Sequence, residues 1–269
     1  MQLLMCPVCQ SPLILNHKQW LCENKHSYDV AKQGYVNLHM VQHKHSKSPG
    51  DTPEAVQARR RFLMAGYYQP LQQKVVEIIK ELNISTALDI GCGEGYYTEQ
   101  MAKSVQQMVA VDIAKNAVQT AAKTSQQENI IWTVATGAVL PVLQNSIDLC
   151  TSLFSPLPKQ EMLRVLKAQG YLLVVTPAPK HLYQMRASLF ESVKLHEPEK
   201  FLSQLQPEFK LIRQETVIAP LDLTQNALQD LICMTPYAWK AKAELRQALE
   251  QRSDFKATAE FQIYVLQYC

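Results

Sequence analysis

Three cysteines and one histidine near the N-terminus have a spacing that suits a metal ion. They follow the pattern C-x2-C-x12-C-x3-H and are Cys6, Cys9, Cys22 and His26. Two close pairs of thiolate and imidazole ligands can surround a zinc ion with no position left open, so the sequence predicts one structural Zn²⁺ per chain. A module of fewer than about 40 residues has too little core to fold alone, so the metal would supply much of its stability. Buried or redox-active cysteines are the alternative, but they do not explain the histidine.

A glycine-rich turn is the strongest chemical signal in the rest of the chain. Residues 88–96 read LDIGCGEGY, so an apolar run with Asp89 leads into Gly91, Gly93 and Gly95. Glycine permits a tight turn and lets a ligand approach the backbone closely. Asp112 ends the next apolar run, where nucleotide-binding sheets place an acid that accepts hydrogen bonds from ribose hydroxyls.

The spacing around these glycines favours S-adenosylmethionine over a dinucleotide. The turn reads G-x-G-x-G rather than G-x-G-x-x-G, and Asp89 stands two residues before Gly91. That carboxylate would repel a pyrophosphate, but it suits a ligand with a cationic amino-acid end. We therefore expect Asp89, the three glycines and Asp112 to bind this cofactor, with a purely structural turn as the alternative.

Two later loops carry candidate catalytic side chains. Phe154 begins the segment 154–157, and His181 ends the segment 176–181, each directly after an apolar run. Both loops would lie at the carboxyl edge of a parallel sheet, where ligands bind. His181 could hold the cofactor, assist proton removal or cap a helix, and the general base is left unassigned.

These candidates need a scaffold of alternating strands and helices, which the apolar pattern predicts from residue 86 onward. The expected strands are 86–90, 108–112, 130–134, 147–153, 171–176, 211–218 and 261–267. Helical stretches between most of them imply a doubly wound α/β sheet of seven strands, mostly parallel.

The segment before this sheet divides into the metal module and a helical connection. Residues 39–53 are polar and read as a linker, and apolar residues return at helical spacing over 70–82. Thr52 can cap an earlier helix, with Pro53 at its first position. We predict a zinc-binding module at 1–38, a linker and helices at 39–83, and the cofactor-binding domain at 84–269.

Composition and charge restrict the partners and the location. Of the 269 residues 47% are hydrophobic, yet no apolar run reaches the roughly 18 residues of a membrane-spanning helix. The N-terminus lacks the features of a secretory signal, so we expect a cytoplasmic protein whose seven cysteines form no disulfide framework. Residues 1–61 hold eight Lys or Arg against four Asp or Glu. That positive end suits phosphate contacts, or it is simply a solvated surface.

Several separate segments, besides the zinc quartet and the glycine turn, carry a family resemblance. They are YDVAKQGYVNL at 28–38, GD at 50–51, ARR and FL within 58–63, GYYQPL at 66–71, PKHL at 179–182 and MTPYAW at 234–239. Through them the chain resembles the bacterial 23S ribosomal RNA (guanine-N1)-methyltransferases of the RlmA/RrmA type. The glycine turn itself resembles motif I of the class I methyltransferases, which implies their Rossmann-like fold. The zinc quartet implies that a zinc-ribbon-like module precedes this fold in the sequence.

The resemblance implies a homodimeric enzyme that methylates N1 of a guanine in a hairpin loop of 23S rRNA, with no membrane partner. Cofactor contacts are carried over onto the matching positions, which are Tyr68, Gly93, Glu94 and His181, with Asp112 at the ribose. In methyltransferases that act on base nitrogens, an aromatic residue in the loop of Phe154 often faces the target base, which has to leave its stack. The zinc module and the positive surface would grip the hairpin.

Two other functions are compatible with the same cofactor turn. One is a small-molecule methyltransferase, because many substrates share this fold and cofactor site. The zinc module and the positive N-terminal segment argue against it. The other is a zinc-bearing RNA-binding protein whose methyltransferase fold is inactive, and the intact Asp89, glycine turn and Asp112 argue against that.

Overall fold

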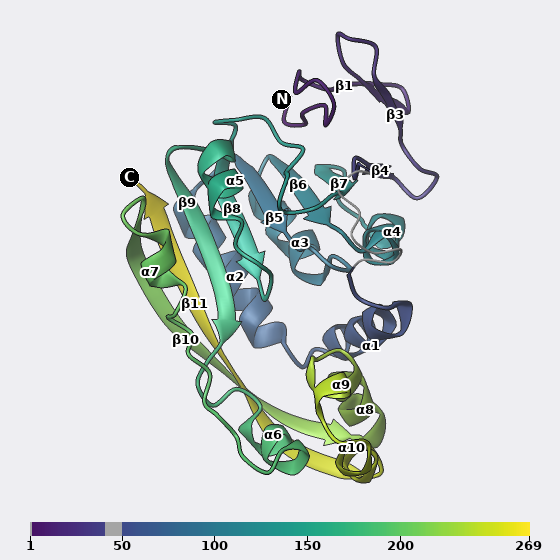
Figure 1. The fold of residues 1–269 in the computed structure, drawn as a ribbon, viewed down its shortest axis with the longest axis vertical. Helices are drawn as coiled ribbons and strands as arrows, with labels where there is room; N and C mark the ends of the chain where they lie inside the picture. Colours follow the sequence, from purple (N-terminus) through teal and green to yellow (C-terminus); the bar gives the residue numbers. More distant parts are fainter. Residues whose placement is uncertain (1, 41–49) are drawn as a thin grey trace.

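The computed structural model describes residues 2–40 and 50–269 and contains one large mixed sheet (Figure 1). Its strand order is β10-β11-β9-β8-β5-β6-β7-β4, and β11 alone runs antiparallel to both of its neighbours. The strands are β4 Tyr35–Asn37, β5 Thr86–Ile90, β6 Gln107–Asp112, β7 Ile130–Val134, β8 Ile147–Leu153, β9 Leu166–Pro177, β10 Phe209–Thr224 and β11 Asp254–Tyr268. The predicted fold class is confirmed, and each of the seven expected strands is present.

The eighth strand comes from a segment that the sequence assigned to the zinc module. β4 pairs in parallel with β7, so that Val36 lies opposite Thr133. Three residues are too few to show a strand period, so the sequence gives no sign of this pairing. The metal module and the sheet are therefore joined by hydrogen bonds; the domain boundaries at 38 and 83 stay a prediction.

Helices cover both faces of the sheet, and alternate residues of the central strands face different cores. Ala87 packs with α2 residues such as Ile78, whereas Leu88 packs with Met162 of α5 on the other face. The helices are α1 Pro53–Met64, α2 Gln69–Leu82, α3 Tyr96–Met101, a 3-10 turn Ala102–Ser104, α4 Lys115–Thr124, α5 Lys159–Val165, α6 Tyr183–Leu189, α7 Leu202–Leu205, α8 Gln225–Cys233, α9 Tyr237–Lys240 and α10 Ala243–Glu250. None of these helices has the length and apolar character needed to cross a membrane within the described ranges.

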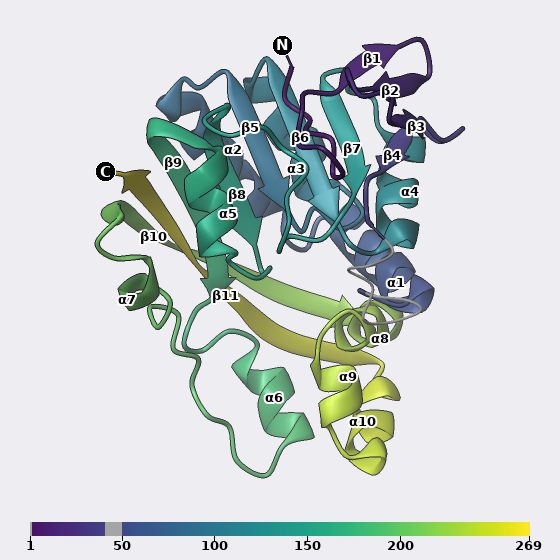
Figure 2. The same ribbon diagram turned by 45° about the horizontal axis from the view of Figure 1, so that its top comes forward.

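Helix α1 begins where the sequence predicts and packs against a helix from the C-terminal part of the chain. The hydroxyl of Thr52 accepts a hydrogen bond from the Ala55 amide at 3.2 Å, and Pro53 occupies the first helical turn. Arg61 pairs with Asp230 of α8 through two hydrogen bonds of 3.0 and 2.5 Å. Figures 1 and 2 show α1 beside α8, with α9 and α10 close to α8, beyond the end of the sheet where the parallel strands finish.

The small N-terminal ribbon contains its own antiparallel sheet of β1 Ile14–Asn16, β2 Gln19–Leu21 and β3 Ser27–Asp29. It docks through Leu3, Leu4 and Leu13, which are buried in the same core as Leu88. The Met5 amide donates a hydrogen bond to the Pro141 carbonyl at 3.0 Å, and the Leu143 amide donates one to the Leu3 carbonyl at 2.8 Å. Figures 1 and 2 show the ribbon at the β7/β4 edge of the sheet, near the end where the parallel strands begin.

Because Leu4 is fully buried at this junction, Leu4→Ala should lower the free energy of unfolding by about 2–5 kcal/mol. Leu15, in the same ribbon, is 51% exposed, so Leu15→Ala should change it by no more than about 0.5 kcal/mol. Urea denaturation of both variants with zinc present makes the comparison. Equal small losses would contradict docking of the ribbon through this core.

Candidate active site and metal centre

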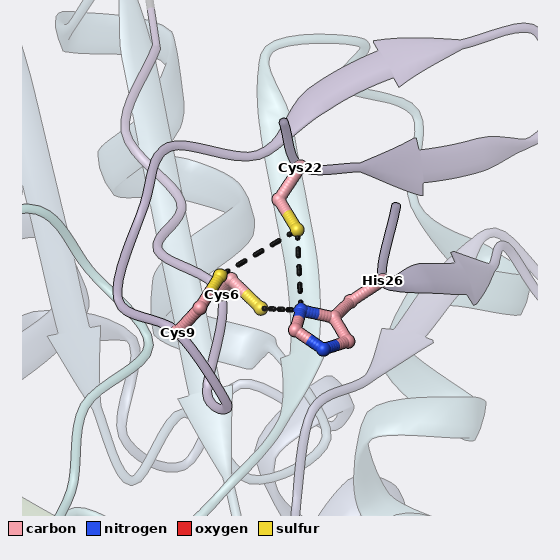
Figure 3. A group of neighbouring side chains, drawn as sticks. All are labelled: Cys6, Cys9, Cys22 and His26. Carbon is pink, nitrogen blue, oxygen red and sulfur yellow. Dashed lines mark hydrogen bonds between the residues drawn. The ribbon is translucent and has the colours of Figure 1, made fainter. Parts of the chain in front are cut away.

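The four metal-ligand candidates meet at one point of the ribbon. The ligand atoms of Cys6, Cys9, Cys22 and His26 all lie within 4.8 Å of one another (Figure 3). The Nδ1 atom of His26 is 3.6 Å from Cys6 Sγ and 3.4 Å from Cys22 Sγ, and the sulfurs of Cys9 and Cys22 are 3.6 Å apart. Bonds of about 2.0–2.3 Å to a tetrahedral zinc ion require separations of about 3.5–3.8 Å between ligands. The donor set therefore fits zinc.

Two tight turns present these ligands. The Gln10 amide donates to the Cys6 carbonyl at 2.9 Å, and the Lys25 amide donates to the Cys22 carbonyl at 3.0 Å. Gln10 and Lys25 both have positive φ, which tightens each turn. Around the sulfurs, the hydroxyls of Tyr28 and Ser11 lie 3.3 Å from Cys6 and 2.9 Å from Cys9. Such outer contacts orient thiolate ligands and favour their charge.

The glycine turn follows β5, and two of its three glycines are packed too closely for a side chain. Gly91, Gly93 and Gly95 have φ of +80, +54 and +86°. A β-carbon at Gly91 would lie 2.5 Å from Ser155 Cβ, and one at Gly95 would lie 2.7 Å from the Trp132 ring. A β-carbon at Gly93 would meet, within the described part of the chain, only Arg59 Nη1, at 3.8 Å. The middle glycine thus leaves backbone accessible beneath Arg59, and this cradle fits a cofactor.

Asp112 ties the turn to the end of β6. One carboxylate oxygen accepts from the Gly93 amide at 2.9 Å, and the other accepts from the Ala114 amide at 2.7 Å, just before α4. Burial raises the pKa of Asp112, and these two amides act in the opposite direction. The acid predicted for the ribose is therefore beside the glycine turn.

Asp89 lies within the core, at 2% exposure, and braces three elements. Its carboxylate accepts from the Thr98 hydroxyl of α3 at 2.6 Å and from the Thr151 hydroxyl of β8 at 2.8 Å. Burial raises the pKa of Asp89 to about 6, against the effect of these hydroxyls. Its predicted contact with the cofactor stays a prediction.

Tyr68 and His181 meet in an aromatic cluster built around Phe261 of β11. The ring of Phe261 lies 4.8 Å from Tyr68, 4.9 Å from His181 and 5.7 Å from Phe154, centroid to centroid. Phe154 is 45% exposed and has a φ of +60°, which is uncommon for an aromatic residue. The two loops that follow β8 and β9 thus come together at the carboxyl edge, as predicted.

His181 is held in one tautomer. Its Nδ1 atom lies 2.8 Å from the Glu260 carbonyl, which can only accept, so Nδ1 carries the proton and Nε2 keeps its lone pair. Burial lowers the pKa of His181 to about 3, and the Glu260 carbonyl opposes this effect. His181 is therefore neutral near pH 7.

The predicted site residues fall into two groups at different ends of the sheet. The cofactor candidates gather at the carboxyl edge, whereas the metal ligands lie in the ribbon beyond the amino ends of the strands (Figures 1 and 2). Sequence reasoning missed Phe261 and gave Arg59 no role. The apolar alternation of β11 does not distinguish Phe261 from its neighbours, and Arg59 was only one member of a basic triplet.

Comparisons with known proteins find relatives of both the N-terminal ribbon and the main domain. A family model described as "RlmA, N-terminal" matches residues 4–47, and one for a methyltransferase domain matches residues 87–170. The 23S rRNA (guanine(748)-N(1))-methyltransferase of Streptomyces fradiae is 30% identical over an alignment of 247 residues, which covers 88% of this chain and 85% of its own. YxjB of Bacillus subtilis (strain 168), provisionally assigned as a 23S rRNA (guanine-N(1)-)-methyltransferase, is 27% identical over 97% of this chain and 95% of its own.

Among solved structures, similarity is found to the complex between the Haloferax volcanii Trm112 methyltransferase activator and a provisionally assigned methyltransferase. The match has a TM-score of 0.51 at 15% identity, and it covers 82% of this chain and 99% of that chain. It supports the fold alone.

Removal of one metal ligand tests the metal centre. Cys22→Ser should lose the bound zinc and unfold at a lower temperature, because three ligands hold the ion less well and the ribbon has little other core. Zinc content by atomic absorption and thermal melting are the measurements. Cys269→Ser, at an exposed position, should keep one zinc per chain. Full zinc retention by Cys22→Ser would exclude the assignment.

The buried His181 should also make the protein sensitive to acid. Its pKa is about 3 in the folded chain and 6.5 ordinarily, so between these values only the unfolded chain binds the proton. Stability therefore falls as pH drops below 6.5, by about 1.4 kcal/mol per pH unit for this one group.

His181→Gln keeps a donor for the Glu260 carbonyl and removes the titrating group. Unfolding free energies measured from pH 8 to 4.5 should fall less steeply for this variant than for the wild type, even if its stability at pH 8 is lower. Half-buried His196, whose pKa burial lowers to about 4, should leave part of the slope in the variant. Parallel curves for the two proteins would show that His181 does not titrate as described.

Proposed function

The chain belongs to the RlmA-type family of S-adenosylmethionine-dependent 23S rRNA (guanine-N1)-methyltransferases, and we propose that it methylates N1 of a guanine in a hairpin loop of that RNA. The similarity to the Streptomyces fradiae enzyme over 88% of the chain carries the proposal. The packed glycine turn beside Asp112 supports it, because it is a cradle for the cofactor that the reaction needs.

The cofactor would supply an electrophilic methyl group on a sulfonium, and the protein would hold donor and acceptor in line. Gly91, Gly93, Glu94 and Gly95 would contact it along the turn, with Asp112 at its ribose. Tyr68 and His181 would bound it from the aromatic cluster. In such a displacement, positioning of the two reactants is the main catalytic contribution.

Phe154 is well placed to receive the target base. Its half-exposed ring stands beside Phe261 at the carboxyl edge, where a base turned out of its stack could rest on it. N1 of guanine carries a proton at neutral pH, so the reaction also needs a proton acceptor or a donor that stabilises the anion. A pKa of about 3 makes His181 a weak base, which favours a positioning role for it over proton removal.

The ribbon would contribute a filled zinc site and a positive surface. Lys18, Lys25 and Lys32 are exposed on it and can contact phosphates of the hairpin. The ribbon lies at the other end of the sheet from the cofactor turn. RNA bound to the ribbon would therefore be contacted far from the cofactor site of the same subunit, where the target base would react. A homodimer in the cytoplasm, as the family resemblance implies, completes the proposal.

The direct test is methyl transfer from labelled S-adenosylmethionine to unmethylated 23S rRNA, with the nucleoside identified by mass spectrometry. We expect 1-methylguanosine, and a loss of at least about tenfold in kcat/KM for Asp112→Asn, because the neutral amide accepts fewer and weaker hydrogen bonds. Asp222→Asn, at an exposed acid of β10, should retain full activity.

The outcomes separate the alternatives. Methylation of a small acceptor without activity on rRNA would favour the small-molecule enzyme. Binding of RNA without any binding of S-adenosylmethionine would favour the inactive RNA-binding protein.

A further inference from the structure

Arg59 of α1 lies directly over the glycine turn, although it belongs to a different part of the chain. Among residues 2–40 and 50–269, its Nη1 atom is the one non-adjacent neighbour within 4 Å of the position that a β-carbon on Gly93 would take. The same atom pairs with the carboxylate of Asp51 at 2.5 Å, and Nη2 donates to the Met234 carbonyl at 3.3 Å. These contacts hold the guanidinium beside the glycine turn, while the side chain of Arg59 stays 27% exposed.

The surroundings of Arg59 are strongly acidic. Burial disfavours the charge of its guanidinium, but attraction to Asp51, Glu94 and Asp112 outweighs burial and raises the pKa of Arg59. Glu94 itself is 4% exposed, and burial raises its pKa against the attraction of Arg59. The turn is thus bordered by several carboxylates and one closely held cation.

This arrangement matches the charges of the proposed cofactor. S-adenosylmethionine carries two cationic groups, its sulfonium and α-ammonium, and one anionic group, its α-carboxylate. The acids of the site suit the cationic groups, but they would repel the carboxylate. A guanidinium is the side chain best shaped to pair with a carboxylate, and Arg59 already pairs with that of Asp51.

We propose that Arg59 binds the α-carboxylate of S-adenosylmethionine and so orients its amino-acid end over Gly93. The proposal rests on the cofactor assignment of the previous section. It makes α1 a part of the cofactor site, and it gives the 50–51 segment the role of aligning the guanidinium through Asp51.

A second polar group near Arg59 also indicates a ligand at this place. The hydroxyl of Tyr97 is buried and has no hydrogen-bond partner among the described residues. Burial raises the pKa of Tyr97, the charges of Tyr68, Tyr96 and Glu94 raise it further, and the positive charge of Arg59 opposes this effect. Buried hydroxyls are normally hydrogen-bonded, and an amino-acid group between Arg59 and Tyr68 could provide the partner.

The experiment compares two cofactors that differ only in this carboxylate. Isothermal titration calorimetry on the full-length, zinc-loaded protein would measure binding of S-adenosylmethionine and of decarboxylated S-adenosylmethionine. The wild type should bind the complete cofactor about 10- to 100-fold more tightly, as expected for a charged hydrogen-bonded pair. Arg59→Met should lose that preference by weakening S-adenosylmethionine alone, and Arg59→Lys should keep part of it.

Arg61→Met is the matched control, because Arg61 lies on the same helix but pairs with Asp230. It should leave both affinities at their wild-type values. Equal weakening of both cofactors by Arg59→Met would assign Arg59 a structural role and overturn the proposal, as would an unchanged preference. A wild-type protein that binds neither cofactor would instead refute the proposed function on which this inference rests.

Discussion

The close packing of the turn at 91–95 is the constraint on which the candidate active site depends. Gly91 faces Ser155 and Gly95 faces Trp132 at distances that exclude a β-carbon, so the loop after β5 is held between the loop after β8 and the Trp132 ring of β7. Only glycine combines this proximity with positive φ at low cost. This packing leaves Gly93 accessible, and it holds the Gly93 amide against Asp112. The surface offered to a cofactor is therefore a consequence of packing between strands that are distant in sequence.

Buried polar groups lock the same region from beneath. Asp89 accepts hydroxyl hydrogen bonds from Thr98 and Thr151, which connects β5 to α3 and β8. Loss of one partner would leave a buried carboxylate unsatisfied, which costs more than a surface hydrogen bond does. Rigid backing of this kind suits a reaction in which alignment of two reactants supplies most of the rate.

The zinc ribbon and the cofactor turn lie at opposite ends of the large sheet, and different interactions stabilise them. The ribbon has little core of its own, and it gains stability from four metal ligands and from leucines shared with the main core. β4 extends the large sheet by backbone pairing, so the ribbon is held to a defined edge. From β4 the chain passes to Gly50 and α1 at the other end, which brings Asp51 and Arg59 to the turn.

Much of this arrangement was predictable from local sequence. The four metal ligands, the glycine turn with Asp89 and Asp112, the cap at Thr52 and seven strands of the sheet all follow from spacing and periodicity over a few residues. These features depend on geometry within one turn, strand or helix, which nearby residues determine.

Only the tertiary structure decided which distant residues meet. Phe261 joins Tyr68, Phe154 and His181 because β11 lies beside β9, and no local pattern in β11 indicates this. Arg59 reaches Gly93 because α1 packs against α8, a helix from a distant part of the chain. The place of the ribbon depends on buried leucines and on a three-residue strand too short to have a period. Such contacts depend on how whole helices and strands pack against one another. The residues that separate these elements in the sequence do not indicate that packing.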